Sequence, residues 1–161
     1  MTAASTRPQI AIVTDDPGWH GRELQKVLAA RGFGSRFLSL MDCRLEPGRQ
    51  PVDVVLPGFG RQLPYGVFVR GVPGGSLEQV ILRLDILHAL EALGIPVMNP
   101  PRVVERTVDK GMTSLLLTRA GLPTPPTWVC ESTDQARAII RRELAAGHRL
   151  VGKPLFGSQG E

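Results

Sequence analysis

Lysine is scarce in this sequence, and its positions carry the clearest chemical signal. The chain has 161 residues and 19 basic side chains, yet only three are lysines: Lys26, Lys110 and Lys153. A compact ammonium group on a flexible stem cannot be replaced equally well by a guanidinium group. Lys110 and Lys153 are therefore candidates for a binding site, and chance retention is the alternative until their neighbours are considered.

A glycine-rich loop follows Lys153 closely. It contains four residues that could surround an anion: Gly157, Ser158, Gln159 and Gly160. Glycines let the main chain approach a ligand, successive N–H groups can form an anion-binding nest, and lysine adds a full charge for phosphate oxygens. The lysine precedes the glycines, so this is not the P-loop pattern. Taken alone, the segment fits a phosphate-binding nest and a plain β-turn comparably well.

Lys110 follows Asp109 just inside the N-terminus of a helix predicted over residues 108–120. Helix N-termini attract anions. A surface lysine beside a first-turn aspartate is nevertheless the commoner arrangement, and it is the better explanation of this pair considered by itself.

The order of four segments along the chain changes this balance. They are Gly94–Pro100 (GIPVMNP), Asp109-Lys110, Ala120–Thr127 (AGLPTPPT) and Lys153–Gly160 (KPLFGSQG). Their order resembles the RimK-like members of the ATP-grasp superfamily, which are glutamate ligases and relatives that add amino acids to proteins or pterin cofactors. The resemblance extends from about Gly66 to Glu161.

This resemblance implies a role for several residues. Lys110 and Lys153 would contact the phosphates of ATP, and the loop Gly157–Gly160 would close over the β- and γ-phosphates. Arg70, at the end of a strand-like run, would bind substrate in the acceptor pocket. ATP would phosphorylate a carboxylate, and the amine of an incoming amino acid such as glutamate would displace phosphate to form an amide.

The resemblance also implies ATP and Mg²⁺ as cofactors. In the family, the adenine-binding segment and the acidic and asparagine ligands of magnesium lie downstream of the glycine-rich loop. We therefore expect no magnesium ligand in this chain and no enzymatic activity from the chain alone.

Strand-like and helix-like segments alternate along residues 8–103. Apolar strand-like runs cover residues 9–14, 35–40, 52–56, 66–70 and 95–98. Helical spacing covers residues 19–31, and the S-x-x-Q capping box at Ser76–Gln79 opens a second helix that ends at Gly94. This alternation predicts a parallel sheet with helices on its faces. The predicted fold class is α/β, with a Rossmann-like pre-ATP-grasp domain over residues 1–103.

Residues 104–161 are predicted to be the truncated start of an ATP-grasp domain. Strands are expected at residues 127–130 and 149–154, and a second capping box, Ser132–Gln135, opens the helix between them. A glycine-rich turn normally leads to a partner strand, and the sequence stops before one. We therefore expect a part of a longer protein, with an open sheet edge that favours homo-oligomers.

Composition limits the other function classes. The chain is 42% apolar, and its net charge of +4 comes from scattered arginines without interleaved aromatics, so nucleic-acid binding is not expected. The chain has no run of 18 apolar residues and no apolar leader segment, so we expect no membrane partner and a cytoplasmic location. Cys43 and Cys130 lack metal-site spacing and are expected to be free thiols.

Two other functions are alternatives to the ligase. A non-catalytic Rossmann-like module that binds a ligand or partner would show the same alternation of strands and helices. A dinucleotide-binding domain is disfavoured because no G-x-G-x-x-G follows the first strand.

The adjacent carboxylates Asp15 and Asp16 are interpreted as turn and capping residues and not as an acid–base pair.

Overall fold

The computed structural model describes residues 7–48, 53–60 and 62–155. The chain divides into two compact units, Met1–Glu105 and Arg106–Glu161, and each is described separately. The sequence analysis placed a domain boundary after residue 103, and the compact units meet two residues later, within helix α3 (Pro101–Val108).

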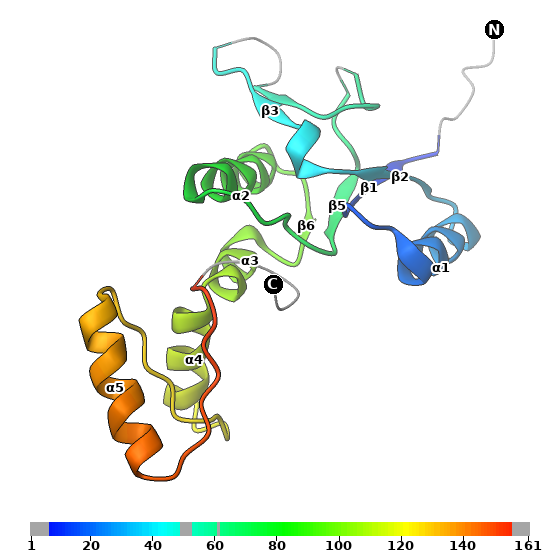
Figure 1. Ribbon diagram of the computed structural model, residues 1–161. Helices are drawn as coiled ribbons and strands as arrows, with labels where there is room; N and C mark the ends of the chain where they lie inside the picture. The colour runs from blue at the N-terminus through cyan, green and yellow to red at the C-terminus, as the bar shows by residue number, and fades with distance from the viewer. Residues whose placement is uncertain (1–6, 49–52, 61, 156–161) are drawn as a thin grey trace, which may run out of the picture. The chain divides into compact units, whose positions relative to one another are not determined.

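A parallel sheet forms the centre of the first unit (Figure 1). Its four strands in the described residues are, in spatial order, β2 (Gly34–Leu38), β1 (Gln9–Val13), β5 (Gly66–Val69) and β6 (Val97–Met98). Strand β1 pairs in parallel with β2 on one side and with β5 on the other. Ala11 and Ile12 on this central strand are fully buried.

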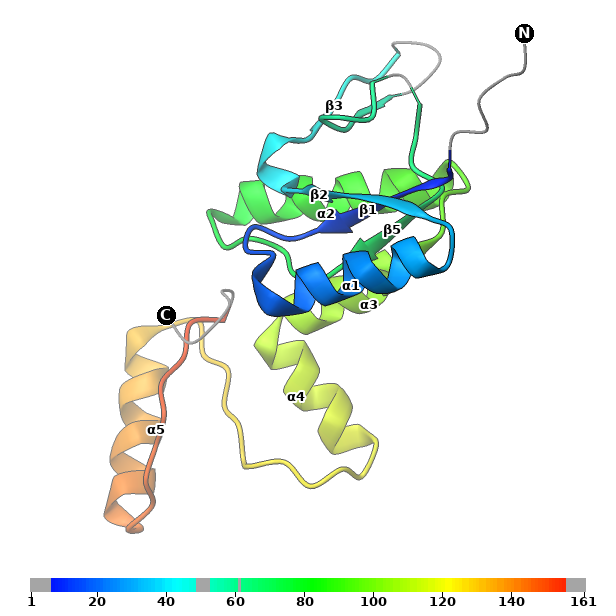
Figure 2. The same cartoon turned by 90° about the vertical axis from the view of Figure 1, so that its right-hand side faces the viewer.

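Helices cover both faces of this sheet. Helix α1 (Gly18–Ala30) connects β1 to β2, helix α2 (Leu77–Ala92) connects β5 to β6, and the two helices lie on opposite faces (Figure 2). Each is a crossover between parallel strands, which fits the preference for a single handedness of such connections. The predicted α/β fold with a parallel sheet is confirmed.

The two predicted capping boxes are also present. At α2, Gln79 N donates to Ser76 Oγ, and Ser76 N donates to Gln79 Oε1 at 3.0 Å. At α5 (Thr133–Ala145), Ser132 and Gln135 exchange the same pair of hydrogen bonds. Each box satisfies two main-chain donors that would otherwise lack a partner at the helix start.

Residues 52–56 were predicted to be a strand of the parallel sheet. A strand is present within the described residues 53–56, but its predicted place in the parallel sheet is wrong. Strand β4 (Val54–Val55) instead pairs in antiparallel orientation with β3 (Arg44–Leu45), in a separate two-stranded sheet that follows the 3₁₀ helix η1 (Leu40–Asp42). The apolar run indicates a strand but not its partner, and here the buried side chains of Leu40 and Leu56 accompany the hairpin pairing.

The second unit contains α4 (Lys110–Arg119), α5 and two extended segments, one before and one after α5, shown yellow and red in Figure 1. Both extended segments were predicted to be strands, at residues 127–130 and 149–154. Neither is a strand, because the described residues supply no ladder of main-chain hydrogen bonds to either segment. Helix α3 was not predicted, although Pro101 at its first position is a known helix-start signal.

The two units differ in what they bury. Within the described ranges, every buried hydrophobic residue lies at or before Val104, so the apolar core belongs to the first unit. In the second unit the one buried residue among those described is a carboxylate, Glu143. No helix in the described ranges has the length and apolar character needed to cross a membrane.

The core of the first unit can be tested on α2, which carries two leucines in contrasting environments. Leu87 is fully buried, whereas Leu82 is 43% exposed. Leu87→Ala should lower the free energy of unfolding by about 2–5 kcal/mol because it removes buried methyl groups and leaves a cavity. Leu82→Ala is the matched control and should change it by about 0.5 kcal/mol or less. Urea denaturation followed by circular dichroism measures both, and equal losses would contradict the assignment of the buried face.

Candidate functional site

The start of α4 contacts the segment that carries Lys153. The main-chain N of Lys110 donates to the carbonyl oxygen of Leu155 at 3.3 Å. Leu155 is two residues beyond Lys153, so tertiary structure brings the two candidate lysine segments together. Lys153 is exposed and Lys110 is half-buried. The four loop residues Gly157, Ser158, Gln159 and Gly160 lie outside the described residues.

A glycine makes this contact possible. A Cβ atom on Gly111 would lie 3.0 Å from Val129 Cγ2 and 3.2 Å from Leu155 Cδ1. Those distances are tighter than ordinary carbon–carbon packing, so a larger residue would push both neighbours away. Gly111 therefore lets two extended segments reach the first turn of α4, next to Lys110.

The helix start itself differs from the prediction. Asp109 is the N-cap of α4 and lies outside the helix, and Lys110 is the first helical residue. Asp109 Oδ1 accepts from Met112 N at 2.9 Å, and the Asp109 carbonyl accepts from Thr113 N. Much of the donor capacity at this terminus is thus used within the chain. Positive charge for an anionic ligand would come mainly from lysine side chains and less from the helix terminus.

An open, largely apolar cavity of about 940 Å³ lies beside the same turn. Helix α4 contributes Met112 and Leu115, the following extended segment contributes Leu122 and Trp128, and Leu155 completes the lining. These apolar side chains are between 40% and 52% exposed, so the cavity offers apolar surface beside the lysine segments.

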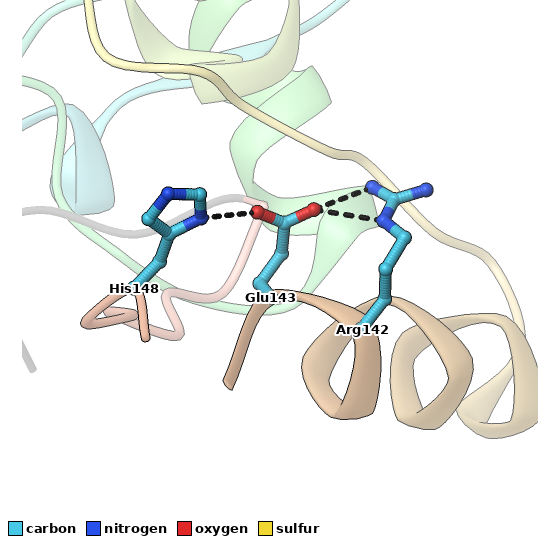
Figure 3. A network of polar contacts seen from close by, with 3 residues as sticks. All are labelled: Arg142, Glu143 and His148. Atoms are coloured by element: carbon cyan, nitrogen blue, oxygen red, sulfur yellow. Dashed lines mark hydrogen bonds and ion pairs between the residues drawn. The ribbon is translucent and has the colours of Figure 1, made fainter. Parts of the chain in front are cut away.

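A polar network holds the C-terminal end of α5 (Figure 3). One carboxylate oxygen of Glu143 lies 2.8 Å from His148 Nδ1, and the other accepts from Arg142 Nε at 2.8 Å. The side chain of Glu143 is only 11% exposed. The hydrogen bond with His148, followed by that with Arg142, holds the pKa of the Glu143 carboxyl below its ordinary value.

This network positions the second extended segment. The main-chain N of His148 also donates to the Glu143 carbonyl at 3.0 Å, so the turn after α5 is held by both main chain and side chain. On the other side, the Arg142 guanidinium lies 5.6 Å from the ring centroid of Trp128, within cation–π distance. Helix α5 therefore holds the segment that leads to Lys153 and the segment that contains Trp128.

Arg70 belongs to the first unit. It directly follows β5, and its main-chain N donates to the carbonyl of Val13 at the end of β1 at 2.9 Å. Chain connections leave β1 and β5 in opposite directions at this point, and parallel α/β sheets commonly bind ligands at such a switch point. The Arg70 side chain is exposed, and no side-chain hydrogen bond or ion pair of Arg70 is found among the described residues.

The carboxylates at the end of β1 act in the turn. Asp16 Oδ1 accepts from Gly18 N at 3.0 Å, and Asp15 Oδ1 accepts from the hydroxyl of Ser39, which follows β2. The Asp16 bond matches the interpretation of this residue as a turn residue, whereas the Asp15 bond joins the ends of β1 and β2. The predicted capping role is wrong, because the N-cap of α1 is Pro17, whose side chain makes no capping hydrogen bond. Within the described ranges, no three His, Cys, Asp or Glu side chains are grouped as metal ligands would be.

Both cysteines are free thiols, as predicted. Cys43 is buried, and its burial, with a smaller effect of the Asp42 charge, raises the pKa of the thiol to about 12. The sulfur donates to the Ser39 carbonyl, so Cys43 acts as a packing residue near the end of β2.

One residue was missed by the sequence analysis. Arg83 on α2 is only 6% exposed, and its Nη1 donates to the carbonyls of Pro73 and Gly74. Helical spacing could have predicted the burial of Arg83, because it lies three residues after Val80 and four before Leu87, on the buried face of the helix.

Comparison with known proteins identifies relatives over most of the chain. No family model matches it. A tetrahydromethanopterin:alpha-L-glutamate ligase from Methanosarcina acetivorans is 32% identical, over 92% of this chain and 46% of that protein. A probable alpha-L-glutamate ligase from Legionella pneumophila is 27% identical, over 95% of this chain and 49% of that protein. The chain therefore spans less than half the length of these two curated relatives.

Solved structures agree in fold. A RimK domain ATP-grasp protein from Sphaerobacter thermophilus matches 83% of this chain and 45% of its own, with a TM-score of 0.64 and 22% identity. The ATP-grasp ligase PsnB, solved with a phosphomimetic variant of its minimal precursor, Mg and ADP, matches 86% of this chain and 52% of its own, with a TM-score of 0.55 and 19% identity. The resemblance to the N-terminal part of RimK-like ATP-grasp proteins is confirmed.

The Glu143 network predicts a pH dependence. Because the folded-state pKa lies below the ordinary value of 4.5, the carboxylate stabilises the fold above that value. This contribution is lost as the pH falls through the lowered folded-state pKa. Glu143→Gln should therefore unfold at lower temperature at neutral pH, and its melting temperature should fall less on acidification. Thermal unfolding from neutral pH to about pH 3 measures this.

The exposed residue Glu131 supplies a matched control. Glu131→Gln should follow the unsubstituted chain at every pH. An acid-side slope that is the same for Glu143→Gln and for the unsubstituted chain would show that Glu143 does not carry this pH dependence.

Proposed function

We propose that this chain, which matches the N-terminal part of RimK-like ATP-grasp proteins in sequence and fold, is part of an ATP-dependent carboxylate–amine ligase. The ligase would add glutamate or another amino acid to a carboxylate of a protein or small molecule. The observation that carries the proposal is the main-chain hydrogen bond between Lys110 and Leu155, because it brings the segment of Lys153 to the start of α4.

In this proposal Lys110 and Lys153 contact the phosphates of ATP. Two ammonium groups from adjacent segments suit a polyphosphate, since each contributes a charge-assisted hydrogen bond. The loop residues Gly157, Ser158, Gln159 and Gly160 would cover the β- and γ-phosphates with main-chain N–H groups. The described residues contain no cluster of carboxylates that fits Mg²⁺, so the proposal takes no magnesium ligand from them.

The chemistry follows from the bound groups. ATP supplies a phosphoryl group that activates the acceptor carboxylate, and the amine of the amino acid then displaces phosphate as the amide bond forms. The residues of this chain would align the phosphates and offset their charge, which is the main protein contribution in phosphoryl transfer. Arg70 would bind the acceptor carboxylate, because its exposed guanidinium can donate two parallel hydrogen bonds.

The named relatives support this class of substrates. Both curated relatives are named as glutamate ligases, and PsnB was solved with a precursor peptide as well as Mg and ADP. We accordingly propose ATP, a carboxylate acceptor and an amino acid as the partners of this chain, and a cytoplasmic setting in which Cys43 and Cys130 stay reduced. The expected homo-oligomer stays a prediction.

The three lysines allow a direct test of the phosphate site. The chain is acylated with a lysine-specific reagent, with and without millimolar ATP, and each site is measured by mass spectrometry. ATP should protect Lys110 and Lys153, whereas adenosine, which lacks phosphates, should protect neither. Lys26 is the internal control, because it is exposed on α1 and paired with Glu23.

The variant Lys153→Met tests whether the two lysines share one site. It should weaken ATP binding about tenfold or more, because a charge-assisted contact is lost. The protection of Lys110 by ATP should weaken with it, whereas Lys26→Met should change neither quantity. Labelling of Lys110 and Lys153 that ignores ATP would contradict a phosphate site formed by these two lysines.

A further inference from the structure

A buried arginine holds the loop that follows Arg70. Arg83 and Glu143 are the two charged residues that are buried in the described ranges. From the second turn of α2, Arg83 Nη1 donates to the Pro73 carbonyl at 2.9 Å and to the Gly74 carbonyl at 2.8 Å. Both acceptors belong to the loop Gly71–Gly75, which connects β5 to α2.

The buried guanidinium group of Arg83 needs its hydrogen bonds to the loop carbonyls. Removing a charge from water is expensive unless hydrogen bonds compensate for it. No ion pair to Arg83 is found in the part of the chain that the structure describes, and its acceptors there are the two main-chain carbonyls of the loop. The loop conformation and the burial of Arg83 therefore depend on each other.

The end of the same loop packs tightly against α2. A Cβ atom on Gly75 would lie 2.5 Å from Gln79 Oε1 and 2.9 Å from Arg83 Nη1. Gln79 Oε1 already accepts from Ser76 N, so it cannot move without loss of the capping box. At Gly74, by contrast, a Cβ atom would meet nothing within 4 Å. A side chain at position 75 would therefore displace Gln79 or Arg83 from its hydrogen bonds, whereas position 74 tolerates a side chain.

The helix start after the loop is already occupied by the chain's own groups. Ser76 Oγ accepts from Gln79 N and donates to the Glu78 carboxylate at 2.6 Å. This carboxylate stands where an anion would bind at a free helix N-terminus, so the loop is not suited to phosphate. At this edge of the sheet, the charge available for an anionic ligand is the exposed guanidinium of Arg70.

We propose that Arg83 is a positioning residue, which holds the loop Gly71–Gly75 so that Arg70 is presented to the carboxylate of the acceptor substrate. The identity of the ligand rests on the proposed ligase function. The dependence of the loop on Arg83 does not, because it follows from the two carbonyl contacts and the packing at Gly75.

The first experiment measures the loop itself. Amide hydrogen exchange of Ser76, whose N–H at the end of the loop donates to Gln79 Oε1, is compared in the unsubstituted chain, Arg83→Met, Gly75→Ala and the control Gly74→Ala. Arg83→Met and Gly75→Ala should exchange at least about tenfold faster, because each removes or displaces charge-assisted bonds to the loop. Gly74→Ala should match the unsubstituted chain. Exchange that is unchanged in both Arg83→Met and Gly75→Ala overturns the proposal.

The second experiment measures the binding of a carboxylate ligand near Arg70. L-glutamate is titrated as the carboxylate probe, and chemical shifts of the amides from Arg70 to Ser76 report binding. Arg70→Met should abolish the response and leave loop exchange unchanged. Arg83→Met should raise the dissociation constant about tenfold although Arg70 is intact. Arg83→Lys, which keeps a donor and a charge, should recover part of the affinity.

The outcomes separate the two proposals. Fast exchange with undiminished glutamate binding in Arg83→Met overturns the positioning role, since the residue would then be structural only. Absence of a glutamate response in the unsubstituted chain overturns the role of Arg70 as a carboxylate ligand. Neither result alters the ATP protection of Lys110 and Lys153, which tests the ligase function independently. Circular dichroism melts confirm that each variant is folded.

Discussion

The second unit depends on one close approach of main chains at the first turn of α4. Gly111 has no side chain, so Val129 and Leu155 can pack against the helix, and Lys110 N can reach the Leu155 carbonyl. Lys153 is covalently tied to this contact because it lies two residues from Leu155. This contact is the structural basis of the proposed phosphate site, because it brings the segment of Lys153 to the start of α4.

Different interactions stabilise the fold of each unit. The first unit is built around β1, where Ala11 and Ile12 are removed from water and helices cover both faces of the sheet. The second unit has no buried hydrophobic residue among those described and relies on the polar contacts of Glu143 and the stacking of Arg142 on Trp128. Polar contacts respond to pH and salt, whereas apolar burial responds mainly to temperature and denaturant.

Burial assigns two arginines of the first unit to opposite roles. Arg70 and Arg83 flank the same loop, one before it and one beneath it. The guanidinium of Arg70 is exposed and would donate to the proposed ligand, whereas Nη1 of Arg83 donates to the loop carbonyls. If the loop next to Arg70 were loosely held, ordering it on binding would cost part of the binding free energy. In the proposal, Arg70 therefore recognises the ligand and Arg83 preorganises the adjacent loop.

Patterns in the sequence were sufficient to predict the fold class and the family resemblance of this protein. Both capping boxes, the alternation of strands and helices, the scarcity of lysine and the order of four short segments were sufficient for the α/β fold and the family resemblance. The capping boxes and the strand and helix patterns act between residues a few positions apart, so they can be recognised without knowledge of the tertiary structure. Only the tertiary structure decided that β4 pairs with β3, that residues 127–130 and 149–154 lack strand partners, and that Arg83 is buried. A hydrogen-bond ladder and a buried charge both need partners from other segments of the chain. A local sequence pattern does not specify which segment provides these partners.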